Sequence, residues 1–217
     1  MFGFSARSRA ARKARGALRE FYGTAPPAPG TNISELSLLA VDVETTGLKP
    51  QQHDLLSIGW VPIDGGVISL EGAGHRVLRG SEVGDSAVIH RLTDDDIEKG
   101  VDAKEAVSDL LRALEGRVML VHWAAMETGF LSAACKRHFG ADFVVPVVDT
   151  FALERRHMER MGTYPRGEDL RLPRIRERYG LPQYRSHNAL IDALACAELY
   201  LALAASFRGN TLKSLQV

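Results

Sequence analysis

Leu38-Leu-Ala-Val-Asp-Val-Glu-Thr-Thr-Gly-Leu48 is an apolar stretch that contains two acidic residues and ends in a turn sequence. As a β-strand it would place Asp42 and Glu44 on one face, because side chains alternate with a period of two. Neighbouring carboxylates repel each other, and burial disfavours their charged forms unless a cation compensates. A hard divalent metal ion would do so. The alternative is a strand end at which both acids reach solvent.

Length and composition fit an ordinary soluble domain with one core and an appendage. The 217 residues are 45% hydrophobic and 25% charged, as such domains are. No apolar run reaches the roughly 18 residues of a membrane span, and the first residues lack the apolar segment of a secretory signal. Two cysteines are too few for a disulfide framework. We therefore expect a cytoplasmic protein without a membrane span.

Basic residues are concentrated at the N-terminus. Residues 1–20 hold six Arg and Lys residues against Glu20 alone, so the rest of this formally neutral chain is net negative. Segment 5–22 predicts a basic helix or arm, which could contact nucleic acid, an anionic membrane or a partner, or be a solvated extension. A Pro-rich linker follows at 24–31. We divide the chain into an arm and linker, residues 1–32, and a main domain, residues 33–217.

The order of the predicted elements is that of an α/β domain. Beyond the first strand, strands are expected in four segments: 54–63, 67–78, 118–123 and 144–149. Helices are expected in four segments: 93–115, 125–138, 150–161 and from Ser186 or Asn188 to 203. Asp64-Gly-Gly66 is a hairpin turn between the second and third strands.

Two further acids lie on helix stripes that should be apolar. Glu127 precedes Phe130 and Leu131 by three and four residues, and Asp192 shares a stripe with Cys196 and Leu199, so each acid should point inward. Accident is a poor explanation for four inward acids in one domain.

Acids and a histidine together suit phosphodiester hydrolysis. Oxygen ligands can hold two divalent ions roughly 4 Å apart, one activating water and the other stabilising the leaving oxygen. His187 precedes Asp192, and a neutral histidine can accept the proton of that water because its unperturbed pKa is about 6.5. Five residues within a helix span about 140 degrees. The two side chains therefore converge only if His187 lies in the turn before the helix.

A second concentration of basic residues lies at 154–185. This segment holds nine arginines and five acids, with tyrosines between them. It is a candidate for phosphate and base contacts. An exposed helix pair with ordinary charge pairs explains the same pattern.

Three of these segments together resemble the motifs of the DEDD superfamily of 3′-to-5′ exonucleases. They are Val41-Asp-Val-Glu-Thr-Thr-Gly-Leu48, Val121-His-Trp-Ala-Ala-Met-Glu-Thr-Gly-Phe-Leu131 and His187-Asn-Ala-Leu-Ile-Asp-Ala193. The resemblance is to the branch with histidine in its third motif, which includes the proofreading epsilon subunit of bacterial DNA polymerase III. Ile89-His-Arg-Leu-Thr-Asp94 is similar to a segment that often lies between the first two motifs. Roughly residues 36–205 are covered.

The resemblance implies a ribonuclease H-like α/β fold, with a mixed central sheet of an antiparallel meander and parallel strands between helices. It implies that two divalent ions, Mg²⁺ or Mn²⁺, are bound. Asp42, Glu44 and Asp192 would hold the first, and Asp42 would bridge to the second. His187 would be the general base. The residues that would border the 3′-terminal nucleotide are Thr45, Thr46, Gly47 and Leu48.

Two residues depart from the family pattern. The second motif usually has aspartate where this chain has Glu127, and the usual His-Asn is His122-Trp123. Glu127 is one methylene longer and could reach the second metal directly or through water. We therefore expect activity to be retained with altered metal geometry, and an impaired site is the alternative.

The function predicted is that of a metal-dependent exonuclease acting on single-stranded or frayed 3′ ends, with DNA favoured over RNA. Its products would be nucleoside 5′-monophosphates, and a DNA polymerase is a candidate partner. An RNA-trimming exonuclease is the alternative among enzymes. From another class, the alternative is a non-catalytic module that binds a 3′ end or a polymerase.

Overall fold

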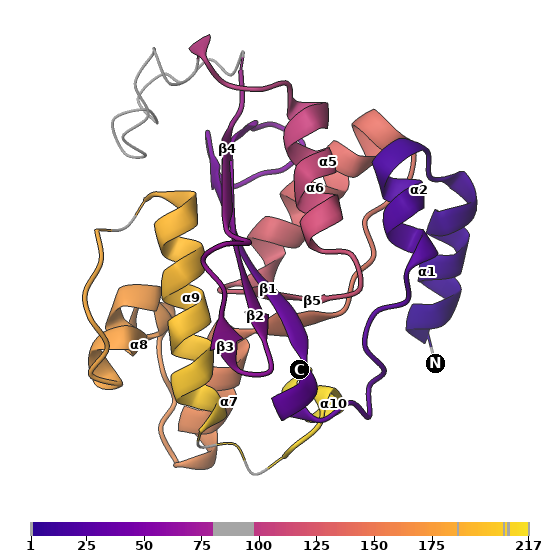
Figure 1. Cartoon of the computed structure of the whole chain (residues 1–217). Coiled ribbons are helices and arrows are strands. Elements are labelled where there is room, and N and C mark those ends of the chain that lie inside the picture. The colour runs from indigo at the N-terminus through magenta and orange to yellow at the C-terminus, as the bar shows by residue number, and fades with distance from the viewer. Residues whose placement is uncertain (1, 80–97, 186, 206, 208, 217) are drawn as a thin grey trace.

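The computed structural model describes residues 2–79, 98–185, 187–205, 207 and 209–216 (Figure 1). The helix start expected at Thr93 and the family-like segment 89–94 lie outside this part of the chain. Among the described residues, no helix is both long and apolar enough to cross a membrane.

A mixed six-stranded sheet forms the centre of the molecule. Its strands are β1 Ser37–Thr45, β2 Leu55–Asp64, β3 Val67–Ile68, β4 Gly74–Val77, β5 Val118–Val121 and β6 Val147–Asp149. The strand order is β3-β2-β1-β5-β6, and β4 also pairs with β2. The strands β1 to β4 pair antiparallel, whereas β5 pairs parallel with both β1 and β6. The predicted meander followed by parallel strands is confirmed.

The third strand differs from its prediction, because 67–78 is broken into β3 and β4. Gly65 and Gly66 have positive φ angles of 57° and 80°, as the turn into β3 requires. Both short strands pair with β2, and residues 69–73 loop out between them beside Pro62. Proline has no N–H to offer a continuous ladder, which accounts for the break.

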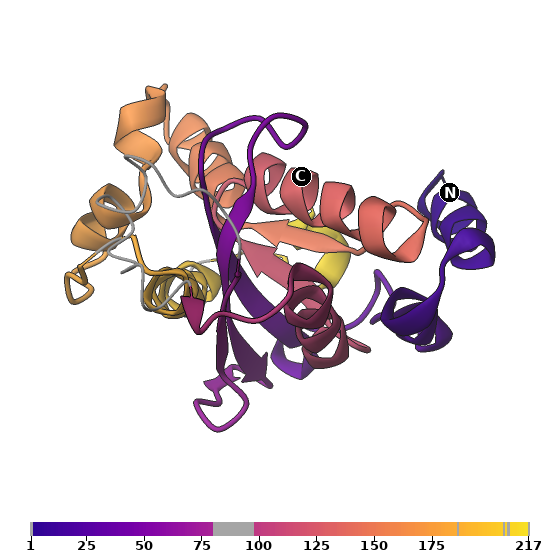
Figure 2. The same cartoon turned by 90° about the horizontal axis from the view of Figure 1, so that it is seen from above.

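Helices cover both faces of the sheet. They are α1 Phe2–Lys13, α2 Gly16–Gly23, α5 Ala103–Ala113, α6 Ala124–Phe139, α7 Thr150–Arg160, α8 Leu172–Arg178, α9 Ala189–Ala204 and α10 Leu212–Leu215, with 3₁₀ turns at Ile33–Glu35 and Gly167–Leu170. The helices α7, α8 and α9 lie on one side, and α1, α2, α5 and α6 on the other (Figures 1 and 2). Leu39 and Val41 join the α5–α6 core, whereas Leu38 and Ala40 join the α9 core. Asp42 and Glu44 continue the alternation on the α9 side.

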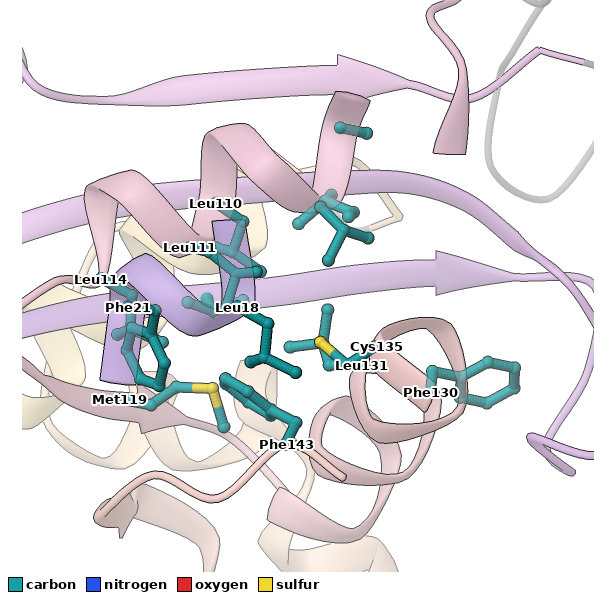
Figure 3. Close-up of a cluster of buried hydrophobic side chains, with 14 of the residues drawn as sticks. Leu18, Phe21, Leu110, Leu111, Leu114, Met119, Phe130, Leu131, Cys135 and Phe143 are labelled. Carbon is teal, nitrogen blue, oxygen red and sulfur yellow. The ribbon is translucent and has the colours of Figure 1, made fainter. Parts of the chain in front are cut away.

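The N-terminal basic segment forms two helices that pack against the α5–α6 layer. Leu18 and Phe21 of α2 are buried in that core, near Met119 and Phe143 (Figure 3). The guanidinium of Arg7 donates to the carbonyl oxygens of Val144 and Thr24, at 3.1 and 2.8 Å. The following linker is hydrogen-bonded to the residues around the start of α10. The division of domains at residue 32 stays a prediction.

The helix α5 begins later than expected. Val101 pairs with Leu78 in an isolated bridge and donates its N–H to Val77 at 2.9 Å. Asp102 then caps the helix by accepting the N–H of Lys104 at 2.8 Å. The bridge removes residues 100–102 from any helix continuous with Thr93, so the expected single helix over 93–115 is wrong.

Candidate active site

Three of the four predicted acids meet between β1 and α9. Carboxylate oxygens of Asp42, Glu44 and Asp192 all lie within 4.8 Å of one another. Glu44 is buried, and the other two are partly buried. The two-residue alternation of β1 and the inward stripe of α9 therefore converge on one cluster, whose oxygens suit a divalent cation.

Burial and the nearness of other carboxyls disfavour the charged forms of two acids in this cluster. Burial raises the pKa of Asp42 well above its ordinary value, and the neighbouring carboxyls of Glu127, Glu44 and Asp192 raise it further. Burial also raises the pKa of Asp192, although the N–H of His187 opposes that shift. A cation bound among these oxygens would stabilise their ionised forms.

His187 lies in the turn before α9, where the sequence required it to be if it was to approach Asp192. Its N–H donates to Oδ2 of Asp192 at 2.7 Å, and its φ angle is 72°. Asn188 caps α9 by accepting the N–H of Ile191 at 3.1 Å. The imidazole of His187 is exposed. The turn thus fixes the backbone of His187 beside the acids and leaves its ring accessible.

Glu127 lies near Asp42 but outside the three-acid cluster. Its side chain is 3% exposed, and its Oε2 has no hydrogen-bond partner among the described residues. Burial raises its pKa well above the ordinary value, and the charge of Asp149 adds to the shift. A buried carboxylate oxygen without a hydrogen-bond partner is costly. A nearby cation would therefore stabilise the ionised form of Glu127.

Asp149 holds the turn from β5 into α6, a role that the sequence analysis missed. Its carboxylate accepts the N–H groups of Trp123 and Ala124 at 2.9 and 3.0 Å. It also caps α7 by accepting the N–H of Phe151 at 3.0 Å. An acid between a strand and a helix does signal an N-cap. Its reach across to residues 123 and 124 depends on the pairing of β5 with β6, which the sequence does not show.

His122, in the second motif-like segment, is a structural residue. Its Nδ1 lies 2.8 Å from Oγ1 of Thr150, and its Nε2 lies 2.9 Å from the carbonyl oxygen of Leu170. Burial lowers its pKa to about 4, so the ring is neutral near pH 7. A carbonyl only accepts, so Nε2 carries the proton. His122 therefore joins β5 to the α7–α8 region.

The segment after β1 forms an ordered loop at the end of the sheet that carries Asp42 and Glu44. Oγ1 of Thr45 donates to the carbonyl oxygen of Gly47 at 2.7 Å. Thr46 exchanges two hydrogen bonds with the backbone of Asp54, at 2.9 and 3.0 Å. Leu48 at the tip is 69% exposed. The four residues predicted to border a nucleotide thus include one large apolar side chain open to solvent.

Two arginines of segment 154–185 form ion pairs with acidic residues of the same chain. Arg176 is 2% exposed and pairs with Glu198 at 2.7 Å. Arg178 pairs with the buried carboxylate of Glu154 at 3.0 Å. These two residues therefore match the alternative of ordinary charge pairs rather than nucleic-acid contacts.

Comparison with known proteins shows the family. Residues 39–200 match the RNase_T family of exonucleases. The chain belongs to this exonuclease family. The match spans all three motif-like segments, so the resemblance to 3′-to-5′ exonucleases with a third-motif histidine is confirmed.

Relatives of the exonuclease include DNA polymerase III proteins of bacteria. It is 29% identical over 173 residues to the DNA polymerase III subunit epsilon of Treponema pallidum, which covers 78% of this chain and 77% of that protein. It is 30% identical over 173 residues to the PolC-type DNA polymerase III of Thermotoga maritima, covering 79% of this chain. The exonuclease spans only 12% of the length of that polymerase.

Solved structures confirm the ribonuclease H-like fold. The nuclease domain of 3′hExo, a DEDDh family member bound to rAMP, superposes with a TM-score of 0.66 at 13% identity. That match covers 81% of this chain and 94% of that domain. Escherichia coli exonuclease I bound to a dT13 oligonucleotide gives a TM-score of 0.63 at 14% identity, covering 77% of this chain and 40% of that one.

Proposed function

We propose that the exonuclease removes nucleotides one at a time from single-stranded or frayed 3′ ends and releases nucleoside 5′-monophosphates in a metal-dependent reaction. The observation that carries this proposal is the cluster of three carboxylates with oxygens within 4.8 Å of one another. Burial raises the pKa values of Asp42 and Asp192, and a bound cation would favour the ionised forms of both. Oxygen-only donors of this kind fit Mg²⁺ or Mn²⁺.

We assign the acids to two ions. Asp42, Glu44 and Asp192 would hold one ion, and Asp42 and Glu127 would hold the second, Glu127 directly or through water. Two such ions supply an activated water and stabilise the charge on the leaving oxygen. The buried Oε2 of Glu127 has no hydrogen-bond partner in the part of the chain that the structure describes, which supports its inclusion, because a second cation would stabilise it.

The residues of the chain supply the proton transfer and the positioning. His187 would accept the proton of the attacking water. Its ring is exposed, while its backbone N–H donates a hydrogen bond to the carboxylate of Asp192. Thr45, Thr46, Gly47 and Leu48 would border the 3′-terminal nucleotide. The hydrogen bonds of Thr45 and Thr46 within their loop would keep that border rigid, which favours a reactive orientation.

DNA is the substrate that we favour. Relatives that align over most of this chain are named as DNA polymerase III proteins, and a DNA polymerase is accordingly the partner we propose. RNA is the alternative, because one similar structure is described as a 3′-exonuclease recognising a histone mRNA stem-loop.

A cleavage assay with matched DNA and RNA strands tests the proposal. Strands of identical sequence, labelled at the 5′ end, are incubated with Mg²⁺, Mn²⁺ or EDTA. We expect a ladder of products shortened from the 3′ end, faster with DNA, with none in EDTA or with Asp42→Asn. Strand binding without turnover would favour the non-catalytic module. Folded protein that cleaves neither strand with either metal would overturn the enzymatic proposal.

A further inference from the structure

We infer that Trp123 stacks on a nucleobase at the 3′ end of the substrate strand, an inference that rests on the proposed function. Trp123 replaces the asparagine that is usual at this position of the second motif. Trp123 is 46% exposed, whereas Trp60 is 5% exposed. A large aromatic ring left open to water at the edge of a site is a candidate contact surface.

Strand β5 and the turn after it place the backbone of Trp123 at the end of the sheet that carries the acids. The strands β1 and β5 are parallel, with Ala40 opposite Leu120, so both end at the same edge of the sheet. Trp123 follows the end of β5 by two residues, at the end of the sheet where β1 carries Asp42 and Glu44, and its N–H donates to the carboxylate of Asp149 at 2.9 Å. On the helix side, Trp123 precedes Glu127 by four residues, about one turn. The backbone of Trp123 therefore lies near Asp149 and Glu127, at the edge of the site.

The backbone at Trp123 is held in an unfavourable conformation. Its φ angle is 84°, in the left-handed region that a bulky residue rarely adopts. Among the described residues, only His187 shares a positive φ without being glycine, and it also adjoins the acids. Asp149 fixes the turn through the N–H groups of Trp123 and Ala124. Strain that the surroundings hold in place is typical of functional sites.

A nucleobase is the ligand that fits these features. The exposed indole offers a flat π surface, and Leu48 offers a second apolar surface after the neighbouring strand β1, with 69% of it exposed. Bases stack on aromatic side chains with little dependence on sequence, because every base has a π face. A contact of this kind would suit an enzyme that shortens strands of differing sequence.

Fluorescence tests the contact without any turnover. Unlabelled single-stranded DNA is titrated in EDTA, and saturation is followed separately by the anisotropy of a 5′-dye-labelled strand. We expect quenching of the wild-type tryptophan emission and little change in Trp123→Phe, because the remaining Trp60 is buried. Unchanged wild-type emission at saturation would overturn the inference and leave the ring to another partner, such as a protein. Absence of strand binding would overturn the stacking inference alone, because the proposed function depends on metal and is decided by the cleavage assay.

Cleavage kinetics test whether the contact is with a base. Trp123→Ala should lower kcat/KM by about 5- to 150-fold, mainly through KM, which corresponds to one lost stacking contact. The loss should fall below about twofold on a strand whose last two nucleotides lack bases. Trp123→Phe should be intermediate. Trp123→Asn tests the same loss in a side chain that tolerates a positive φ, in case the alanine variant is poorly folded.

The outcomes separate the inference from the function on which it rests. Equal losses on the normal and the baseless strand would show that Trp123 only maintains the fold, and would overturn the stacking role. Unchanged kinetics in Trp123→Ala would also overturn the stacking role. A wild-type protein that binds strands with quenching but never cleaves them would instead contradict the enzymatic proposal alone.

Discussion

Gly59 of β2 lies directly opposite Asp42 of β1, and the first turn of α9 passes over Gly59. A methyl group on Gly59 would lie 2.2 Å from the carbonyl carbon of Ala189 and 2.3 Å from the nitrogen of Leu190. Backbone atoms of a helix cannot move aside far enough to make room for a methyl group at these distances. Glycine at this position therefore lets α9 approach the sheet closely enough for Asp192 to join Asp42.

Gly59→Ala should weaken both the fold and the metal site. Overpacking against backbone typically costs about 1–3 kcal/mol of unfolding free energy, and moving the start of α9 would separate Asp192 from Asp42. Denaturant unfolding and Mn²⁺ titration measure the two effects. Gly30→Ala is the matched control, because nothing lies within 4 Å of its added methyl. Wild-type Mn²⁺ affinity in Gly59→Ala would show that this contact does not position Asp192.

Local periodicity explains what could be predicted from the sequence. Asp42 and Glu44 share a face because strand side chains alternate, and Asp192 points inward because of its helix stripe. Asn188 marks the start of α9 through its capping side chain. Each of these features depends on residues within a few positions of one another, so a pattern in the chain reveals it.

Contacts between distant segments explain what could not be predicted. Nothing near Gly59 in sequence indicates that Ala189 will pack on it, and nothing near Asp149 indicates that it will bond to Trp123. The bridge between Leu78 and Val101 that delays α5 is also long-range. Glu127 was expected to point inward, but its separation from the three-acid cluster depends on how α6 docks, which no periodicity contains.

The stability of the metal-free protein should fall as pH rises through the raised pKa values of its acids. Asp42, Glu127 and Asp192 have pKa values above their ordinary values in the folded state. Above the ordinary values of about 4, the unfolded chain has therefore released protons that the folded protein still binds. Stability then falls with pH until the folded groups also ionise.

Thermal unfolding in EDTA between pH 5 and pH 8 measures this dependence. As pH rises, the melting temperature of wild type should decrease more than that of Asp42→Asn. Added Mn²⁺ should stabilise more at pH 8 than at pH 5, because its ligands must be deprotonated, and by about 2.7 kcal/mol at 100 times Kd. Asp64→Asn is the control, since Arg117 lowers the pKa of Asp64 and this acid is ionised throughout. A wild-type profile parallel to that of Asp42→Asn contradicts the prediction.

Glu127 should contribute to activity at a cost to metal-free stability. Glu127→Gln removes a buried carboxylate that has no partner for Oε2 among the described residues, so metal-free unfolding at pH 8 should require as much denaturant or more. Its kcat should nevertheless fall by about 10²-fold, as when a group that stabilises transition-state charge is lost. Glu127→Asp should retain part of the activity and Glu127→Ala very little. Full activity in Glu127→Ala would show that residues 121–131 are not the second motif.

His187 should act in proton transfer rather than in metal binding. Removing a general base typically lowers turnover by about 10²–10⁴-fold, so His187→Ala should lower kcat on that scale while Mn²⁺ affinity stays near that of wild type. His187→Asn is the sharper variant, because asparagine tolerates the φ angle of 72° that the turn imposes. The N–H that binds Asp192 is also kept. Asp42→Ala, by contrast, should lose Mn²⁺ binding and activity together.

The pH–rate profile decides between proton transfer and mere positioning, since its acidic limb should disappear in His187→Asn if the ring accepts the proton. Equal rates of wild type and His187→Asn across neutral pH would remove His187 from the mechanism.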